Sequence, residues 1–195
     1  MSDYFVLPGQ DDPLSSDVFT IQGRNTTFIF DAGASDIAAD YINGIEGDKI
    51  LVISHFHQDH TANVGRLQGI KAIYGGRKTC DHIKTGTVVN EKLGLLDGVA
   101  IDVMPLTSCH AKGSLMMCLN STWLFVGDAM CPCSTPLGEG WNAGMLLSTI
   151  REIGSVDAQW VIPSHTGEVL SKDEAVARLK SVYAKRDGNN PYIIL

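Results

Sequence analysis

The sequence has few basic residues for its acidic content. Lys and Arg total 15 against 22 Asp and Glu, which gives a formal net charge of −7 at pH 7 with the histidines neutral. A protein that binds nucleic acid through its phosphates needs a basic face that displaces counterions. This balance argues against a nucleic-acid partner, and it fits an acidic site whose charge is partly offset by bound cations.

Long apolar stretches and a disulfide framework are also missing. No segment approaches the roughly 20 apolar residues that a membrane-spanning helix requires. The five cysteines are an odd number without a paired spacing, and the segment from Met1 to Gly9 has neither the basic nor the apolar part of a secretion signal. We therefore expect a reduced, cytoplasmic protein without membrane attachment, and no pattern indicates its oligomeric state.

The overall composition is that of a folded globular chain. Its 195 residues are 44% apolar and 19% charged. This length suits one domain and is short for two. Because the sequence contains no internal repeat, no low-complexity segment and no linker rich in Pro, Gly or Ser, we predict a single domain over residues 1–195.

Strand and helix patterns alternate along the chain, and several of the strands lead directly into polar loops. Runs rich in β-branched and aromatic residues predict strands at 18–21, 26–30, 49–54, 72–74, 99–103, 115–119, 123–126 and 159–163. The pairs 18–30 and 115–126 read as hairpins. Helical patterns predict helices over 61–67, most of 77–96, 142–153, and from Ser171, where Ser171 and Glu174 have the spacing of a capping box.

The most informative segment is His55-Phe56-His57-Gln58-Asp59-His60, which directly follows a buried strand. It places three imidazoles and one carboxylate on a single tight loop. These donors suit Zn, Fe or Mn, and the absence of thiolates argues against a closed structural zinc site. The segment therefore predicts a metal site with an open position.

Four further polar residues follow predicted strands. Asp31, His110, Asp128 and His165 each come after a strand, as does the loop that begins at His55. A lone His or Asp in such a place is most often a hydrogen-bonding residue. Together with the loop, these residues are candidates for one site.

The ordered set of motifs resembles the metallo-β-lactamase superfamily of metallohydrolases. The resemblance runs from the hairpin before Asp31 to the helix after Ser171. It implies an α/β fold, an αββα sandwich of two mixed sheets flanked by helices, with a dinuclear site at one edge of the sheets. It also implies two divalent metal ions, foremost Zn with Fe or Mn as alternatives.

The same resemblance implies a role for each site residue. His55, His57 and His110 would bind one metal, while Asp59, His60 and His165 would bind the second. Asp128 would bridge the two metals, and Asp31 would support the site without coordinating. The carboxylates expected to take part in catalysis are accordingly Asp31, Asp59 and Asp128.

Two cations bridged by a carboxylate can hold a hydroxide between them at neutral pH, so hydrolysis is the expected reaction. The chain has no room for the inserted RNA-binding or glutathione-binding regions of some family members, which favours a small ester, thioester, lactone or phosphoester as substrate. Two alternatives stay open. One is a mononuclear-iron sulfur dioxygenase of the same superfamily, using His55, His57 and either Asp128 or His110. The other is a metal-binding module without turnover.

Some residues near the motifs differ from the family pattern or have no assigned role. Many relatives have Gly before the histidine equivalent to His110 and Thr-Pro after it, whereas this chain has Cys109 before it and Ala111-Lys112 after it. Lys112 either is solvated or attracts an anionic group of the substrate. Cys131-Pro132-Cys133 lacks the usual CxxC spacing, so ordinary thiols are the simpler interpretation. Trp141, among several glycines, is a candidate wall of the substrate pocket.

Overall fold

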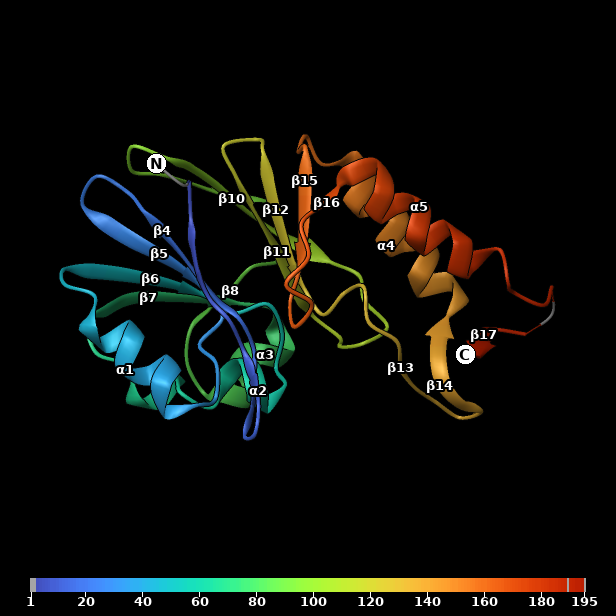
Figure 1. Ribbon diagram of the computed structural model, residues 1–195, viewed down its shortest axis with the longest axis horizontal. Coiled ribbons are helices and arrows are strands. Elements are labelled where there is room, and N and C mark those ends of the chain that lie inside the picture. The colour runs from blue at the N-terminus through green and yellow to red at the C-terminus, as the bar shows by residue number, and fades with distance from the viewer. Residues whose placement is uncertain (1–2, 189, 195) are drawn as a thin grey trace.

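Two six-stranded sheets stack face to face in the computed structural model, which describes residues 3–188 and 190–194 (Figure 1). The first sheet has the order β1 (Phe5–Leu7), β4 (Val18–Gln22), β5 (Thr26–Phe30), β6 (Asp48–Val52), β7 (Ile70–Gly75) and β8 (Thr87–Val88). Its first three strands are antiparallel, and β5 to β8 are parallel.

The second sheet has the order β16 (Leu170–Ser171), β15 (Trp160–Pro163), β12 (Trp123–Gly127), β11 (Ser114–Leu119), β10 (Ala100–Leu106) and β9 (Leu93–Leu96). Only β12 and β15 are parallel, so both large sheets are mixed. A three-stranded sheet of β13 (Cys133–Thr135), β14 (Gly138–Asn142) and β17 (Tyr192–Ile194) and a hairpin of β2 (Gln10–Asp11) and β3 (Leu14–Ser15) are added to them.

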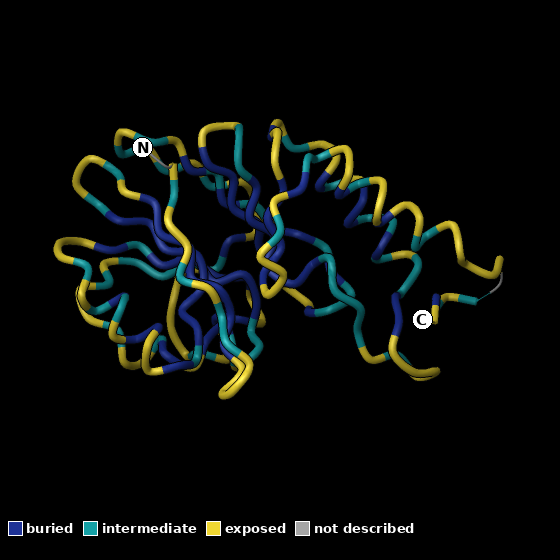
Figure 2. The backbone as a smooth tube through the Cα atoms, in the orientation of Figure 1, coloured by how far each residue is buried: buried dark blue, intermediate teal, exposed yellow. Residues whose placement is uncertain are grey.

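The space between the sheets is filled by alternate side chains of the facing strands. Phe19, Phe28 and Phe30 of the first sheet point inward, and Phe125 of the second sheet meets them with its ring centroid 4.9 Å from that of Phe19. Figure 2 shows the resulting band of buried backbone through the middle of the molecule. Burial of a large apolar side chain contributes about 1.5–3 kcal/mol, so this layer is a main source of stability.

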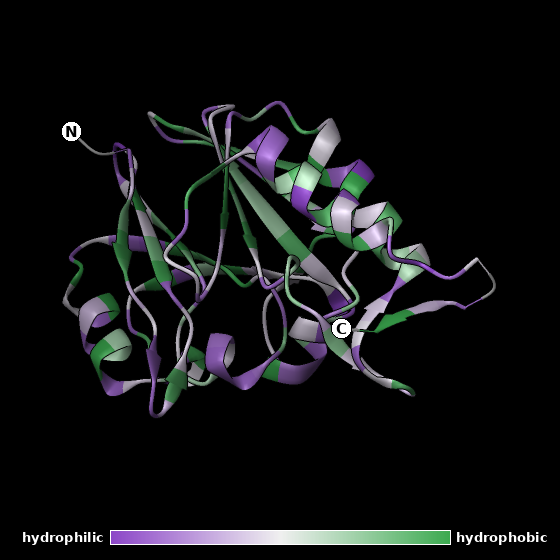
Figure 3. Ribbon diagram, turned by 45° about the vertical axis from the view of Figure 1, so that its right-hand side comes forward, coloured by the Kyte–Doolittle hydropathy of each residue, from purple (hydrophilic) through white to green (hydrophobic). Residues whose placement is uncertain are grey.

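Helices cover the outer faces of the two sheets. On the first sheet, α1 (Asp36–Gly44) packs Ala38 and Ile42 against the face opposite the phenylalanines. On the second sheet lie α4 (Ala143–Ser155) and α5 (Lys172–Tyr183), which bury Leu146 and Leu179. Figure 3 shows hydrophilic and hydrophobic segments alternating along these two helices, as in amphipathic helices. The predicted sandwich of two mixed sheets flanked by helices is confirmed.

Some of the local predictions are confirmed and others are wrong. Both predicted hairpins form, and Ser171 caps α5 by accepting the amide of Glu174. The helix predicted over 61–67 is wrong: α2 (Gln58–Thr61) ends at Thr61, whose hydroxyl donates to the carbonyl of His57, and a 3₁₀ turn (Val64–Arg66) follows.

Two further expectations are corrected. The helix predicted across 77–96 stops early, because α3 (Arg77–Ile83) ends at Lys84, which has a left-handed φ of 60°, and β8 and β9 follow. Trp141 is not a wall of a substrate pocket, since it is 4% exposed and packs in the core beneath the second sheet with Leu146. Within the part of the chain that the structure describes, no helix is long and apolar enough to cross a membrane.

Candidate metal centre

The loop that carries three of the histidines is held rigidly at the end of β6. The carbonyl of Val52 accepts the amide of Asp31, and the amide of Ile53 donates to Tyr74, so both neighbouring strands fix the start of the loop. The single turn of α2 then returns the chain, and the carbonyl of His60 accepts the amide of Ala32 at 3.0 Å. These backbone hydrogen bonds fix both ends of the histidine loop.

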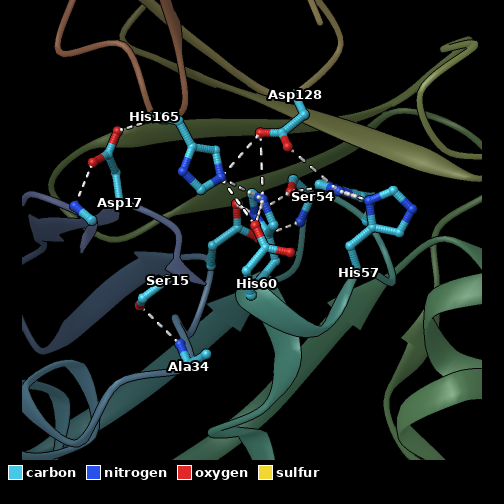
Figure 4. Close-up of polar contacts among 12 residues, drawn as sticks. Ser15, Asp17, Ala34, Ser54, His57, His60, Asp128 and His165 are labelled. Atoms are coloured by element: carbon cyan, nitrogen blue, oxygen red, sulfur yellow. Dashed lines mark hydrogen bonds and ion pairs between the residues drawn. The ribbon is translucent and has the colours of Figure 1, made fainter. Parts of the chain in front are cut away.

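The structure brings all seven predicted ligands together. Figure 4 shows four of them, His57, His60, Asp128 and His165, converging on one place. The seven form two groups, in each of which the potential ligand atoms lie within 4.8 Å of one another: His55, His57 and His110 in one, and Asp59, His60, Asp128 and His165 in the other. Four separate segments of the chain contribute. The division into groups matches the assignment expected from the sequence, which itself stays a prediction.

Asp128 stands between the two groups. Its Oδ2 lies 3.3 Å from His110 Nε2 and 3.9 Å from His55 Nε2. Its Oδ1 lies 3.3 Å from His60 Nε2 and 3.7 Å from His165 Nε2. Each carboxylate oxygen therefore faces a different group, which is the arrangement that a bridging ligand requires.

The position of Asp128 depends on the residue before it. Gly127 has a left-handed φ of 54°, and a Cβ there would lie 2.7 Å from the Cβ of Ser54. Its carbonyl accepts the amide of Ser164 at the end of β15. Only glycine allows β12 to approach the loop so closely, and this approach carries Asp128 to the ligands from the first sheet.

A layer of hydrogen bonds beneath the ligands fixes their rings. The fully buried Asp31 places Oδ2 2.8 Å from His60 Nδ1 and accepts the backbone amide of Ser54 at Oδ1, 2.7 Å away. The hydroxyl of Ser54 lies 2.9 Å from His55 Nδ1. On the other side, His110 Nδ1 lies 2.9 Å from the carbonyl of Pro132. In each of these histidines Nδ1 is engaged, which leaves Nε2 facing the centre.

Sequence reasoning missed two of these supports. One is Ser54, which directly precedes the histidine loop. Only its position next to His55 in the sequence could have pointed to its role. Asp17 lies 148 residues from His165 in the sequence, yet its Oδ2 accepts the backbone amide of His165 at 2.9 Å. The Oδ1 of Asp17 accepts the amide of Gly9 at 2.7 Å, so this carboxylate links the segment at Gly9 to the loop of His165.

Burial and neighbouring charges shift the pKa values of the site in opposite directions. Burial, reinforced by His60, lowers the pKa of His55 to about 2, so that its ring is neutral. Burial opposes ionisation of Asp128 and Asp59, but the neighbouring rings of His110 and His60 hold the pKa of Asp128 below its ordinary value, and those of His165 and His60 do the same for Asp59. Neutral imidazole and ionised carboxylate are the forms that bind metals.

Three other histidines of the site, His60, His110 and His165, keep their protons more tightly. Burial alone would lower the pKa of His60, but Asp31 and Asp128 raise it well above the ordinary value. The pKa of His165 is raised by its hydrogen bond with Asp59, and that of His110 by Asp128 despite burial. The negative charge of the nearby carboxylates causes these shifts, because it stabilises the protonated imidazoles. A bound cation would neutralise the same negative charge.

The donor set fits divalent cations. Among the described residues, His110 Nε2 and Asp128 Oδ1 are buried without a hydrogen-bond partner, although both face the centre. Burying a polar atom costs free energy unless a hydrogen-bond partner or an ion pairs with it. Five imidazoles with two carboxylates, and no thiolate, suit Zn, Fe or Mn.

The centre opens into a cleft of 480 Å³. The hairpin of β2 and β3 forms one wall through Gln10 and Leu14, and Thr166 forms another, while His57 and Asp128 lie at the floor. The size suits a small molecule.

Two cysteines near the centre stay protonated. Burial, together with the charge of Asp128, raises the pKa of Cys131 to about 11. Burial, together with the neighbouring Cys133, raises the pKa of Cys109 to about 12.

Comparison with known proteins agrees with this site. The family model of the metallo-beta-lactamase superfamily matches residues 11–165. An archaeal superfamily protein from Sulfolobus tokodaii aligns over 97% of this chain and 90% of its own, with a TM-score of 0.71 and 17% identity. A B3 metallo-beta-lactamase with an active-site glutamic acid aligns over 95% and 90%, with a TM-score of 0.69 and 14% identity.

The fold is also similar to that of a flavoprotein. A flavoprotein from Thermotoga maritima aligns over 97% of this chain, with a TM-score of 0.70 and 13% identity, although this chain spans only 63% of it. No curated protein matches the chain by sequence. At these identities the structural likenesses establish the fold and leave the reaction open.

Proposed function

The chain belongs to the metallo-β-lactamase superfamily, and from this premise we propose that it is a hydrolase that works with two divalent metal ions. The observation that carries the proposal is the position of Asp128. Its Oδ2 lies 3.3 Å from His110 and its Oδ1 lies 3.3 Å from His60, so one carboxylate serves both groups of ligands. A site for a single ion would not need a carboxylate shared in this way.

The proposed division of ligands follows the two groups. His55, His57 and His110 would hold one ion, and Asp59, His60 and His165 the other, with Asp128 shared between them. When bound, such ions supply Lewis acidity toward a carbonyl or phosphoryl oxygen and lower the pKa of water. Zn is the ion that we expect first, with Fe or Mn as alternatives.

The protein's own contribution is orientation and charge. Asp31 and Ser54 fix the rings of His60 and His55, so the donor atoms need little rearrangement when a substrate arrives. Only Asp59 and Asp128 bring negative charge among the proposed ligands. Two carboxylates against two dications leave the centre positive, which favours electron-rich oxygens of small esters, thioesters, lactones or phosphoesters.

A second candidate is an iron-dependent oxidation, including the sulfur dioxygenase reaction known in this superfamily. The fold does not distinguish it from hydrolysis, since the TM-score is 0.70 for the Thermotoga flavoprotein, 0.71 for the Sulfolobus superfamily protein and 0.69 for the B3 metallo-beta-lactamase. The imidazole and carboxylate donors suit iron as well as zinc. Metal identity therefore separates the two candidates better than the fold does.

The deciding experiment combines metal analysis with a substrate panel. Purified protein is analysed for metal content and assayed on neutral and charged esters, thioesters, lactones and phosphodiesters. Close to two ions per chain with turnover of one bond class supports the hydrolase. One iron per chain with oxygen uptake on a persulfide supports the oxidation, and bound metal without any turnover supports a non-catalytic metal-binding module.

A further inference from the structure

A second pocket adjoins the metal centre. It has a volume of 580 Å³ and shares His110 with the cleft. Three lysines line it: Lys78 from α3, Lys84 at the end of α3, and Lys112 from the loop after His110. Phe56, next to the proposed ligand His57, gives it an apolar surface. We call this the lysine pocket.

The lysine pocket is positive in an acidic protein. Its lining holds the three lysines against a single carboxylate, that of Asp81, while the chain as a whole has a net charge of −7. Within residues 3–188 and 190–194, no ion pair involves Lys78, Lys84 or Lys112. Three lysines facing one carboxylate leave an excess of positive charge that repels itself, and an anion bound among them lowers this cost.

The backbone holds two of these lysines in a fixed relation to His110. A methyl group on Gly76, which precedes α3, would collide with the carbonyl oxygen of Gly113. The start of α3 is therefore packed directly against the loop that carries His110 and Lys112. The hydroxyl of Ser114 also closes this loop by donating to the carbonyl of Ala111 at 2.9 Å. These contacts fix where the backbones of Lys78 and Lys112 lie relative to His110.

We propose that the lysine pocket binds an anionic group of the substrate, a phosphate or a carboxylate, that is separate from the bond that is cleaved. This inference rests on the proposed hydrolase function and narrows its substrates. A substrate whose reacting group lies at His57 and Asp128 can extend past His110, lay its linking atoms on Phe56, and place a charged end among the lysines. Lysines bind such groups as mobile point charges.

The test uses matched substrates and charge variants. For each bond class, one substrate is neutral and two carry a distant carboxylate or phosphate on the leaving group. The ratio of kcat/KM for the anionic substrate to that for the neutral one is measured in the wild type and in Lys78→Met with Lys112→Met. Methionine keeps the apolar stem of the lysine, and Lys84 is left unchanged because its φ of 60° ends α3.

In the double variant we expect the ratio to fall about tenfold, mainly through KM, because each exposed ion pair contributes up to about fivefold. The variant with arginine at both positions should keep the ratio within about threefold, since the charge is retained. Lys185→Met, in the exposed turn after α5, is the matched control and should leave the ratio as it is. The inference is overturned if the methionine variant keeps the wild-type ratio or if the control loses as much.

A binding measurement separates this inference from the proposed function. Methylphosphonate and acetate are titrated into isotopically labelled protein while backbone amide signals are followed. We expect shifts at residues 77–84 and 110–113 for at least one of the two anions, and their loss in the methionine variant. Shifts confined to residues 55–60 and 128 would show binding at the centre alone and overturn the inference. If shifts appear in the pocket but no panel substrate is cleaved, the hydrolase proposal fails and the pocket stands.

Discussion

Asp31 and His60 form a pair that is closed off from solvent: Asp31 Oδ2 lies 2.8 Å from His60 Nδ1, and neither side chain is exposed. The other oxygen of Asp31 accepts the amide of Ser54, so both oxygens are engaged beneath the ligands, and Asp31 belongs to neither group of potential ligands. Its backbone has a left-handed φ of 65°, which holds the carboxylate beneath the histidine loop. Asp31 therefore acts on the centre through His60.

Replacing Asp31 by Asn should lower turnover more than it lowers metal content. The amide keeps the size of the side chain but loses the charge that orients the ring of His60 and raises its basicity. We expect kcat/KM to fall by about 10- to 100-fold, the usual effect of removing a carboxylate that supports a metal-binding histidine. Activity, metal content and melting temperature are measured on the same preparation. Full activity with a lower melting temperature would assign Asp31 to folding alone.

His57→Ala and Asp128→Ala should differ in metal stoichiometry. His57 belongs to one group of ligands, so its loss should weaken one ion while the other persists. Asp128 faces both groups, with His110 and His60 each 3.3 Å from one of its oxygens, so its loss should lower the occupancy of both. Metal analysis after dialysis against a defined free-metal concentration gives the comparison. Normal metal content in the Asp128 variant would contradict the shared-ligand assignment.

The convergence of the seven candidate ligands could be predicted from the sequence because they include five of the chain's six histidines, three of them on one loop. The supporting residues could not. Asp17 acts through a contact that spans 148 residues, and a single Asp carries no pattern that points to so distant a partner. Nor could the early end of α3 be predicted, since it depends on the left-handed conformation of Lys84, a residue that is ordinary in helices.

Metal affinity should rise with pH. The pKa of His60 is raised by Asp31 and Asp128, that of His165 by Asp59 and that of His110 by Asp128, so these rings hold protons at a higher pH than usual. A cation must displace those protons, and each one displaced changes the affinity by up to about tenfold per pH unit below the pKa. His55, whose pKa is lowered to about 2, adds nothing to this dependence.

Competition with a coloured chelator at pH 6, 7 and 8 measures this effect once the chelator's own titration is subtracted. We expect tighter binding at pH 8 than at pH 6, together with proton release on metal addition in a weakly buffered solution. An affinity that stays constant across this range would mean that the three rings are already neutral before the metal binds.

Gly127→Ala should lower both the stability of the protein and its metal content, and the loss of stability should exceed the cost of backbone strain alone. A left-handed φ costs an ordinary residue about 1–2 kcal/mol, and Gly47→Ala, with a φ of 84° and no atom within 4 Å of the added Cβ, measures that cost by itself. At Gly127 the added Cβ would also lie 2.7 Å from the Cβ of Ser54. Since Ser54 supports His55 and Gly127 precedes Asp128, the collision must push apart the two sides of the site.

Denaturant unfolding should show a larger loss of stability for Gly127→Ala than for Gly47→Ala, and metal content should fall only in Gly127→Ala. If both variants lose equal stability and keep their metal, the contact between β12 and the histidine loop does not position Asp128.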